Sequence, residues 1–529
     1  MEQTVRYGIG EQDFQSLRER DCVYVDKTRY IDTIINSGSK YYFLARPRRF
    51  GKSLFLSTLQ YFFEGRRELF KGLYIDSRNW DWVKYPVLRI DLNTERYAHP
   101  GLLDNVLDNL FRKWEAAYGV VANDNTYSQR FSNIIQAAHE KTGRQVVILV
   151  DEYDKPLVGN LNKDENLEHY REKLATLYSN FKSSASHIRL VFLTGVSRFS
   201  KLSVFSDLNN LKDITFSNEF ADICGITEEE LVSDLKDGVK KLAQANKTSV
   251  EKAYSDLKKN YDGYRFAEEG SDIYNPWSLL NCLDQSKIDN YWNDTGLPTI
   301  IREALQRVDA NLEEAFDLYC TSDDLKGLDL LNPNPTALMY QTGYLTIKDF
   351  FSETNEYLLS IPNCEVKRGF FNYLLPYYVD CKSVSTNKVV ADIIRSFILG
   401  NPDAAMKGMQ AYFAGINFKL KMDNENNFHN AFYLLTDLIG LNASTEVCTS
   451  DGSIDIMIQT SKYIYVIELK YDGKAETAIR QIEEKRYARP YQTDCRKLFK
   501  IGVDFSSKTR CIENWIGCSV LCSKINSHY

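Results

Sequence analysis

The sequence predicts an α/β protein whose N-terminal part is a parallel β-sheet with flanking helices. Apolar, β-branched runs of strand length recur along this part, and helical stretches separate them. Buried parallel strands are typically continuous apolar runs, and their alternation with helices is typical of a sheet covered on both faces. The expected strands are residues 41–45, 86–92, 146–150 and 188–196.

The pattern changes after about residue 220, and 529 residues are enough for several domains. Thr227 precedes a helical stretch and Glu230 follows three residues later, which is a capping-box pattern. Helices then dominate until two strand-like pieces and a helix suggest a small winged-helix-like module. Helices give way to strands again near the C-terminus. We therefore expect an α/β domain at 1–225, a helical lid region at 226–330, a winged-helix-like module at 331–384 and a second α/β domain at 385–529.

The composition is that of a globular protein, with 43% hydrophobic and 26% charged residues. A formal net charge of −7 excludes a protein that coats nucleic acid with a globally basic surface, so any such contact must be local. The 11 cysteines are dispersed, which suits a reducing cytoplasm, and Cys511, Cys518 and Cys522 are expected to be plain thiols and not metal ligands. No apolar run approaches the roughly 20 residues of a membrane helix. We expect a cytoplasmic protein without membrane contact.

A phosphate-binding loop is predicted at residues 46–53, Arg-Pro-Arg-Arg-Phe-Gly-Lys-Ser, between a strand and a helix. Backbone N–H groups at the start of that helix would face phosphates. Gly51 lets the backbone pass close to them, Lys52 would reach the β- and γ-phosphates, and Ser53 would ligate Mg²⁺. The loop therefore predicts ATP, or another nucleoside triphosphate, bound with magnesium. A surface Gly-Lys-Ser without a ligand is the alternative.

The loop departs from the usual pattern G-x-x-x-x-G-K-[ST] because Arg46 replaces the first glycine. Either the backbone of the loop begins differently, or the arginine side chain points outward. Arg48 and Arg49 lie inside the loop and could add positive charge near the nucleotide. Phe50 and Leu54 complete the expected nucleotide contacts of this segment.

A second motif, Val-Asp-Glu, ends the apolar strand at 146–150. Asp151 would orient Mg²⁺ and its water, and Glu152 would polarise the attacking water. Two acids that merely cap a strand and face solvent are the alternative. The next strand ends at Thr194, which could sense the γ-phosphate. Arg198 could act as an arginine finger, contact a neighbouring domain, or be an ordinary loop arginine.

An acidic cluster is predicted on a hairpin near the C-terminus. Asp455 lies on one strand, and Glu468 and Lys470 share a face of the next. Two carboxylates would hold Mg²⁺, or Mn²⁺ in its place, and the lysine would position water for phosphodiester cleavage. Charges solvated on a half-exposed hairpin are the alternative, but the apolar residues around Glu468 imply burial.

Polar residues on flanking elements extend this cluster. Accessory roles are expected for one acid on the preceding strand and for two residues on a helix predicted at 476–488, and nearby basic residues could touch phosphates. The accessory residues are Glu446, Gln481 and Tyr487, and the basic ones are Lys485, Arg486 and Arg489.

Together these motifs resemble bacterial AAA-like ATPases that carry a C-terminal nuclease-like domain of the PD-(D/E)XK type. The resemblance covers nearly the whole chain. Its motifs are YVDKT at 24–28, RPRRFGKSL at 46–54, LVDEYDKPL at 149–157, TGVSRFS at 194–200, YDGYRF at 261–266, YNPWSLL at 274–280, YWNDTG at 291–296, YQTGYLTI at 340–347, LSIPNCEVK at 359–367 and the set Asp455, Glu468 and Lys470.

The resemblance implies a P-loop NTPase domain at 1–225 and a restriction-endonuclease-like domain at 385–529. It implies that Arg46 is a family trait. One departure concerns the residues before Asp455: the family often has Gly-Arg three and two residues earlier, and here Gly452 is followed by Ser453. The residues implied to serve nucleotide and magnesium are Lys52, Ser53, Asp151 and Glu152, and those implied for the nuclease-like centre are Asp455, Glu468 and Lys470 with Glu446 and Gln481 as accessories.

Three functions follow as hypotheses. The first is an ATP-gated nuclease acting on nucleic acid, DNA before RNA, with a role in defence against or maintenance of mobile DNA by family analogy. The second is a nucleotide-driven switch whose nuclease-like domain binds a partner without cutting. The third, a small-molecule kinase, is least favoured because nothing after the loop resembles an acceptor site. A homo-oligomer is compatible with an Arg198 that acts across an interface. His429 and the many tyrosines are expected to be packing residues.

Overall fold

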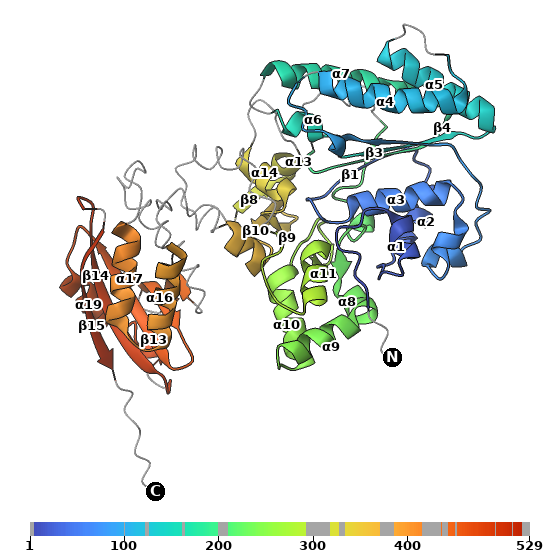
Figure 1. The fold of residues 1–529 in the computed structure, drawn as a ribbon. Coiled ribbons are helices and arrows are strands. Elements are labelled where there is room, and N and C mark those ends of the chain that lie inside the picture. The colour runs from blue at the N-terminus through green and yellow to red at the C-terminus, as the bar shows by residue number, and fades with distance from the viewer. Residues whose placement is uncertain are drawn as a thin grey trace. The chain divides into compact units, whose positions relative to one another are not determined.

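In a computed structural model, the chain forms two compact units (Figure 1). The first unit ends near Lys367 and the second begins at Arg368. The structure describes residues 5–99, 101–121, 126–160, 164–198, 210–292, 318–326, 334–370, 386–414, 435, 443–449, 452–491, 494–509 and 511–520.

The first unit is built on a parallel sheet with strand order β2-β3-β4-β1-β5. The four predicted strands are confirmed within one or two residues, and β5 is a short addition. Strand β1 lies between β4 and β5, so the carboxyl ends of these strands share one edge. The bounds are Tyr41–Ala45 for β1, Val87–Asp91 for β2, Val146–Asp151 for β3, Ile188–Gly195 for β4 and Lys212–Asp213 for β5.

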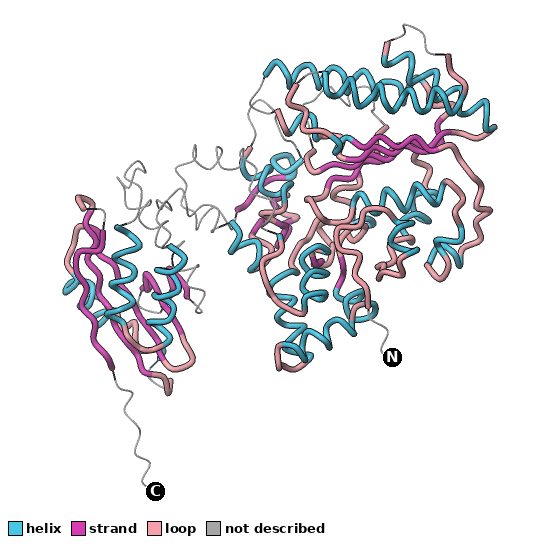
Figure 2. The backbone as a smooth tube through the Cα atoms, in the orientation of Figure 1, coloured by secondary structure: helices cyan, strands magenta, loops and turns pink. Residues whose placement is uncertain are grey.

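Helices cover both faces of this sheet, as the parallel arrangement requires (Figures 1 and 2). Helices α4, α5 and α7 lie on one face, and α1, α2 and α3 lie on the other. Apolar residues spaced four apart, such as Leu103, Leu107 and Phe111 in α4, are fully buried. The bounds are Phe14–Glu19 for α1, Arg29–Asn36 for α2, Lys52–Phe63 for α3, Gly101–Tyr118 for α4, Tyr127–Thr142 for α5, Lys155–Val158 for α6 and Asp164–Ser183 for α7, with 3-10 turns at Arg67–Phe70, Tyr74–Ser77, Leu92–Thr94 and Asn218–Phe220.

A helical part follows in the same unit around its own apolar cluster. The predicted capping box is confirmed: the Thr227 side chain accepts from the backbone N–H of Glu230, and the Glu230 carboxylate accepts from that of Thr227. Its elements are α8 at Glu228–Asp234, α9 at Lys236–Ala245, α10 at Val250–Tyr261 and α11 at Pro276–Gln285, with the short strands β6 at Ile226–Thr227 and β7 at Ile273–Tyr274.

The last part of the first unit contains a three-stranded antiparallel sheet, in the order β8-β10-β9, and the helices α13 and α14, and a helical stretch begins at residue 364 after β10. They include the described part of the segment predicted as winged-helix-like, in which helix α14 precedes the two strands β9 and β10. Residues 371–384 of that segment, and His429, lie outside the described part of the chain. The bounds are Leu318–Thr321 for β8, Ser322–Lys326 for α13, Pro335–Thr342 for α14, Thr346–Phe351 for β9 and Glu356–Ser360 for β10.

The second unit is a five-stranded mixed sheet in the order β11-β12-β13-β14-β15, with helices on both faces. Helices α16 and α17 share one apolar cluster with the sheet, and α19 shares the other. The bounds are Thr386–Ile398 for α16, Pro402–Ala414 for α17, Ala443–Thr449 for β11, Gly452–Gln459 for β12, Tyr463–Tyr471 for β13, Ala475–Glu484 for α19, Lys497–Ser506 for β14 and Cys511–Val520 for β15, with a 3-10 turn at Arg489–Tyr491.

Helix α19 is shorter than the predicted 476–488. Lys485 is its C-cap, and Arg486 has φ +50°, a left-handed conformation that ends the helix. Tyr487 therefore lies beyond the helix and not on it. None of the helices that the structure describes is both long and apolar enough to cross a membrane.

Candidate functional site

The predicted phosphate loop joins β1 to α3, and Gly51 is the N-cap of that helix. Gly51 has φ +94°, and a Cβ there would meet nothing within 4 Å, so the backbone conformation and not the available space favours glycine. Lys52 follows as the first helical residue and is buried. Its Nζ donates to the carbonyl oxygens of Arg46 and Pro47, each at 3.0 Å. The loop carbonyls thus hold the ammonium group inside the loop, whereas Ser53 and Leu54 are half-buried in the first turn.

Arg46, where the usual pattern has glycine, is turned inward and is only 1% exposed, so of the two alternatives the outward side chain is not the one seen. Its guanidinium donates to the carbonyl oxygens of Ala45 and Thr215 at 2.9 and 2.7 Å, and to those of Phe220 and Ala221 at 3.1 and 3.4 Å. Burial lowers the pKa of this group. Arg46 therefore ties the start of the loop to the segment after β5.

The next three side chains of the loop point in different directions. Arg48 is exposed. The Arg49 guanidinium lies 3.8 Å from the centre of the Trp277 ring on α11. Phe50 is buried, and its ring meets that of Tyr264 edge-on at a centroid distance of 4.8 Å. The side chains of Arg49 and Phe50 thus anchor the loop to the helical part, so any contact these two residues make with nucleotide would come from their backbone.

Asp151 and Thr194 meet at the carboxyl edge of the sheet, as the strand order implies. The Thr194 hydroxyl donates to Asp151 Oδ1 at 2.7 Å, and both residues are buried. Arg89 on β2 approaches the other carboxylate oxygen, with Nη2 3.6 Å from Oδ2. Arg89 was not predicted, because its only signal in the sequence is a charged residue inside an apolar strand. Thr194 and Arg89 fix the aspartate next to the phosphate loop.

Glu152 and Asp154 follow Asp151 in a strained turn. Glu152 has φ +49°, and burial raises the pKa of its carboxyl group, while the nearby Lys52 lowers it. Asp154 accepts the backbone N–H groups of Val196 at 3.1 Å and Ser197 at 2.6 Å, and burial also raises its pKa. This second missed residue ties the turn after β3 to the turn after β4. The acidic pattern Asp-Glu-Tyr-Asp at residues 151–154 is the feature of the sequence that could have indicated Asp154.

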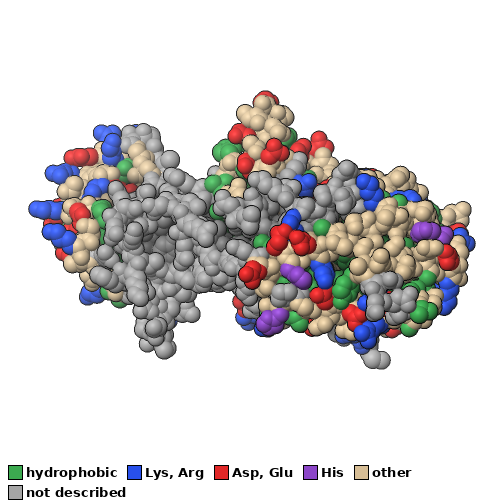
Figure 3. Space-filling view, turned by 90° about the horizontal axis from the view of Figure 1, so that it is seen from above, with side chains coloured by type: hydrophobic (Ala, Val, Ile, Leu, Met, Phe, Trp, Pro, Cys, Tyr) green, Lys and Arg blue, Asp and Glu red, His purple; other side chains and the backbone are tan. Residues whose placement is uncertain are grey.

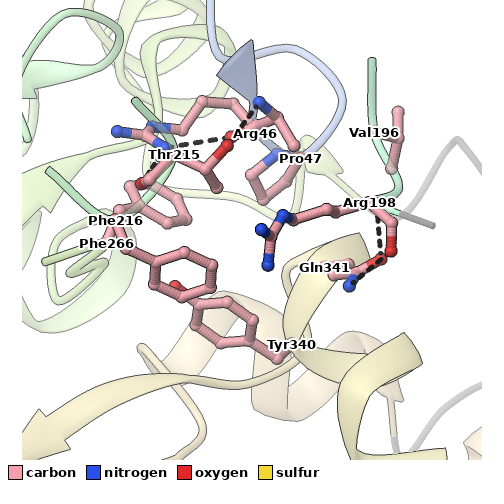
Figure 4. Close-up of a pocket in the computed structure, with 10 residues that line it drawn as sticks. Arg46, Pro47, Val196, Arg198, Thr215, Phe216, Phe266, Tyr340 and Gln341 are labelled. Atoms are coloured by element: carbon pink, nitrogen blue, oxygen red, sulfur yellow. Dashed lines mark hydrogen bonds between the residues drawn. The ribbon is translucent and has the colours of Figure 1, made fainter. Parts of the chain in front are cut away.

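Arg198 contacts both β5 and helix α14. Its side chain pairs with Asp213, and its backbone N–H donates to Gln341 Oε1 at 2.9 Å. The guanidinium points toward aromatic side chains in a small pocket beside the start of the loop (Figure 4). Arg198 therefore contacts a helix of the segment predicted as a winged-helix-like module, within the first unit. The pocket is lined by Ala45, Arg46, Pro47, Val196, Arg198, Thr215, Phe216, Phe266, Tyr340 and Gln341.

In the second unit, Asp455 lies where β12 and β13 part. The paired register of β12 and β13 runs from Gln459↔Ile464 to Ile456↔Ile467, and β13 continues to Tyr471 paired with β14. Beyond the last pair, Asp455 Oδ2 accepts the backbone N–H of Leu469 at 2.7 Å. At this fork between the two strands, the carboxylate thus accepts a hydrogen bond that a backbone carbonyl of β12 would accept in a continuous sheet. Extending the register of the two strands by one residue places Asp455 opposite Glu468.

Glu468 and Lys470 lie on the face of β13 that α19 covers. Lys470 Nζ is 3.0 Å from Glu468 Oε1, whereas Glu468 Oε2 is buried and has no hydrogen-bond partner in the described part of the chain. The Glu468 side chain is 1% exposed. Burial and, to a smaller extent, the nearby Asp455 raise the pKa of this carboxyl group, Lys470 lowers it, and the net value is about 7. The structure thus brings together the three residues of the predicted centre.

The three predicted accessory residues lie on different elements around this centre. Glu446 on β11 lies between Thr445 and Val447, whose partners in β12 flank Asp455, so it occupies the register position opposite that aspartate. Gln481 is on α19 and half-buried. Tyr487 is buried, and a Cβ at Gly452 would lie 2.8 Å from its hydroxyl. Tyr487 therefore packs against the start of β12.

The donor set of the second site suits a hard divalent cation. Glu468 Oε2 is a buried acceptor left over after Lys470 has paired with the other oxygen, and Asp455 is adjacent. Mg²⁺ is commonly held by one or two carboxylates and keeps several waters. Nowhere in the described ranges do three or more His, Cys, Asp or Glu residues form a potential metal cluster, and this includes Cys511 and Cys518.

Comparisons with known proteins agree with this geometry. The family described as Predicted AAA-ATPase (AAA-ATPase-like) matches residues 7–205, and the PD-(D/E)XK nuclease superfamily matches residues 423–515. The chain is also 33% identical over 519 residues to an uncharacterized protein in the vnfD 5′ region of Azotobacter chroococcum mcd 1. That alignment covers 96% of this chain and 98% of the relative. With both sheets and both sets of motifs in place, the chain belongs to the family of AAA-ATPase-like proteins that carry a PD-(D/E)XK nuclease-superfamily domain.

Proposed function

We propose that the protein binds and hydrolyses ATP with Mg²⁺ in its first unit and cleaves nucleic acid with Mg²⁺ or Mn²⁺ in its second. The observation that supports the nuclease most is the convergence of Asp455, Glu468 and Lys470 at the fork between β12 and β13. A carboxylate buried without a partner for one oxygen is costly in a purely structural role. Its retention beside a second carboxylate favours a metal-binding role.

At the proposed nuclease centre, each residue has a separate task. Asp455 and Glu468 would hold the cation, which supplies charge for the scissile phosphate and lowers the pKa of bound water. Lys470 is held by Glu468 Oε1 and is about a quarter exposed, so its ammonium group reaches solvent beside the carboxylates. It would orient the attacking water or stabilise charge on the phosphate.

The substrate proposed is DNA, bound through local basic residues. Lys and Arg side chains gather on the described surface of the second unit that Figure 3 shows. Lys485, Arg486 and Arg489 follow α19 and are exposed. Tyr487 in the same turn packs against Gly452, close in sequence to Asp455. These cations would contact phosphates without reading base sequence.

At the proposed ATP site, the loop at 46–53 would bind the phosphates, and Asp151 with Ser53 would hold Mg²⁺. Glu152 would polarise the attacking water from the turn that follows Asp151. The Lys52 ammonium group, which the loop carbonyls of Arg46 and Pro47 hold in this structure, would exchange those acceptors for phosphate oxygens.

A cleavage assay tests the proposal. Labelled single- and double-stranded DNA and RNA are incubated with Mg²⁺ or Mn²⁺, with and without ATP. We expect cutting by the wild type and its loss, by at least about a hundredfold, in Asp455→Asn and Lys470→Met. Asp455→Asn is the matched variant because its amide oxygen can still accept the Leu469 N–H, so the fork is kept while the charge is removed. Lys52→Ala tests whether nucleotide controls the cutting.

A nucleotide-driven switch that binds without cutting is the second candidate. The observation that favours it is Ser453, where the family often has arginine. If no condition gives cutting while ATP binding is intact, this second function replaces the nuclease. If Asp455→Asn cuts as fast as the wild type, the proposed centre is wrong.

A further inference from the structure

We propose that helix α14 belongs to the ATP site and that Gln341 is a positioning residue for the loop after β4. This inference rests on the proposed ATP hydrolysis. It gives α14, which lies in the segment predicted to be a winged-helix-like module, a role at the proposed ATP site of the first unit. Helix α14 contacts both the phosphate loop and the loop that carries Arg198.

Arg198 lies across the end of β1. It follows β4, whereas its partner Asp213 is in β5, and β1 runs between these two strands. The ion pair therefore spans the point where the chain leaves the sheet to form the phosphate loop. The pocket beside it is lined by Arg46 and Pro47 from that loop and by Tyr340 and Gln341 from α14 (Figure 4). Any displacement of the loop start changes the surroundings of Arg198.

Gln341 holds the backbone of Arg198 from the other side. Its Oε1 accepts the Arg198 N–H at 2.9 Å, and its Nε2 donates to the carbonyl oxygens of Leu325 and Arg198 at 3.1 and 3.4 Å. The side chain is 6% exposed. Both ends of the amide are thus used, and a carboxylate could replace only the acceptor end. A buried amide with three such contacts fixes both the position and the direction of the loop.

The end of α14 also touches the phosphate loop. Gly343, its C-cap, has φ +89°, and a Cβ there would lie 2.9 Å from Pro47 Cβ. One turn of helix before it, the Tyr340 ring stacks on Phe216 at a centroid distance of 5.8 Å. Three contacts therefore connect the end of α14 to the edge of the sheet. Tyr340 contacts the segment after β5, Gln341 the loop after β4, and Gly343 the phosphate loop after β1.

These contacts imply a specific division of labour. Nucleotide binding depends on Lys52 and the backbone of the loop, to which Gln341 makes no hydrogen bond among the described residues. Hydrolysis additionally requires a defined position of the end of β4 and of the loop after it, because Thr194, near the end of β4, donates to Asp151. Loss of the Gln341 amide is therefore expected to lower kcat for ATP hydrolysis and to leave the Kd for ATP nearly unchanged.

The experiment compares the full chain with Gln341→Ala, Arg198→Ala and the double variant. We expect kcat about tenfold lower in Gln341→Ala, with the Kd for ATP within about twofold of the wild type. Because Gln341 acts through the loop that carries Arg198, the double variant should be no slower than the slower single variant. Gln341→Glu, which keeps only the acceptor, should fall between wild type and Gln341→Ala.

A matched control and a structural readout separate positioning from packing. Thr342→Ser changes the next residue of α14, whose hydroxyl bonds only to carbonyls of its own helix in the described contacts, and kcat should stay unchanged. Amide hydrogen exchange of residues 194–198 should rise in Gln341→Ala and not in Thr342→Ser. Additive losses in the double variant, or an equal fall in ATP affinity, would overturn the inference.

The outcomes also distinguish failure of the inference from failure of the proposed function. If the wild type hydrolyses ATP and Gln341→Ala does so equally fast, only the inference fails. If the wild type binds ATP without hydrolysis, faster exchange at 194–198 in ATP-bound Gln341→Ala than in ATP-bound wild type supports the positioning, and equal exchange refutes it. If Lys52→Ala and wild type alike fail to bind ATP, the proposed function fails and the inference with it.

Discussion

A single arginine can organise several carbonyl oxygens because its guanidinium presents five N–H donors in a fixed plane. Arg46 uses this property on four carbonyl oxygens from three segments, and its guanidinium also lies 4.5 Å from the centre of the Phe266 ring. The residue that breaks the usual phosphate-loop pattern is therefore a structural anchor.

Arg46→Gly, which restores the usual first glycine, is expected to destabilise the protein by about 3 kcal/mol or more. Four buried carbonyl oxygens would lose their donors. The free energy of unfolding of the nucleotide-free protein, from urea denaturation, measures the effect. The control is Arg48→Gly, an exposed position in the same loop, where the change should stay near 0.5 kcal/mol. Equal effects at both positions would show that Arg46 is no anchor.

Glu468 makes stability depend on pH. Its carboxyl group has an ordinary pKa of 4.5, and burial raises the folded value to about 7. Between these values the folded state binds more protons than the unfolded state, so stability falls as pH rises, by about 3 kcal/mol in all. Glu468→Gln removes the ionisable carboxyl group, and with it the loss of stability as pH rises. We expect the variant to be more stable than the wild type at pH 8, with the difference nearly gone at pH 4.

Denaturation at both pH values in the presence of a chelator checks this prediction. Mg²⁺ or Mn²⁺ added at pH 8 should narrow the difference, because a bound cation stabilises the charged carboxylate of the wild type only. A difference between variant and wild type that stays the same at every pH would contradict the raised pKa.

The candidate residues were largely predictable because they lie in motifs, but their contacts were not. The spacing of Asp455, Glu468 and Lys470 on a hairpin predicts their proximity, which the structure shows. Arg89 and Asp154 were missed, since each acts through a partner on another strand. The inward turn of Arg46 depends on carbonyls after β5, which no local pattern reveals.

At the scale of elements, α19 covers Glu468 only because β14 lets it come close. Gly502 pairs with Glu468 in the register of β13 and β14. A Cβ at Gly502 would lie 2.8 Å from the backbone nitrogen of Ile479 and closer still to the carbonyl oxygen of Ala475. The glycine therefore sets the distance between the helix and the site.

Gly502→Ala is expected to push α19 away from the sheet, at a cost of about 1–3 kcal/mol. The added exposure of Glu468 should also lower its pKa toward the ordinary value. The control is Gly517→Ala on the neighbouring strand β15, where a Cβ would meet nothing within 4 Å. Thermal denaturation and the pH dependence of stability measure the two effects. Equal behaviour of the two variants would refute the close packing of α19.

The helices and strands themselves followed well from periodicity and apolar runs, as β1 and β3 show. The end of α19 did not, because Lys485 and Arg486 are good helix formers and only the left-handed backbone of Arg486 stops the helix. The short strand β5 was also missed, since two residues carry no periodicity and pair only because β1 is beside them.

At the scale of the whole molecule, two compact units imply two unfolding transitions in calorimetry. Mg²⁺-ATP at about 100 times its Kd should stabilise the first unit by roughly 2.7 kcal/mol. In Lys52→Ala the stabilisation of the first unit by Mg²⁺-ATP should vanish, and the unfolding temperature of the second unit should not change. A shift of both transitions by ATP in the wild type would show that the units are coupled, as an ATP-gated nuclease requires. A single transition that ATP leaves unmoved would contradict ligand binding in the first unit.

The buried Arg46 has a consequence for how such proteins are found. A pattern search that demands glycine at the first position of the phosphate loop passes over this chain, although strand, helix, lysine and serine are all in place. Since the acceptors at Thr215, Phe220 and Ala221 are backbone carbonyls, the anchor depends on the path of that segment and not on its side chains. A search that asks for arginine at the loop start, followed by Phe-Gly-Lys-Ser, would gather chains with the same internal anchor and leave conventional phosphate loops aside.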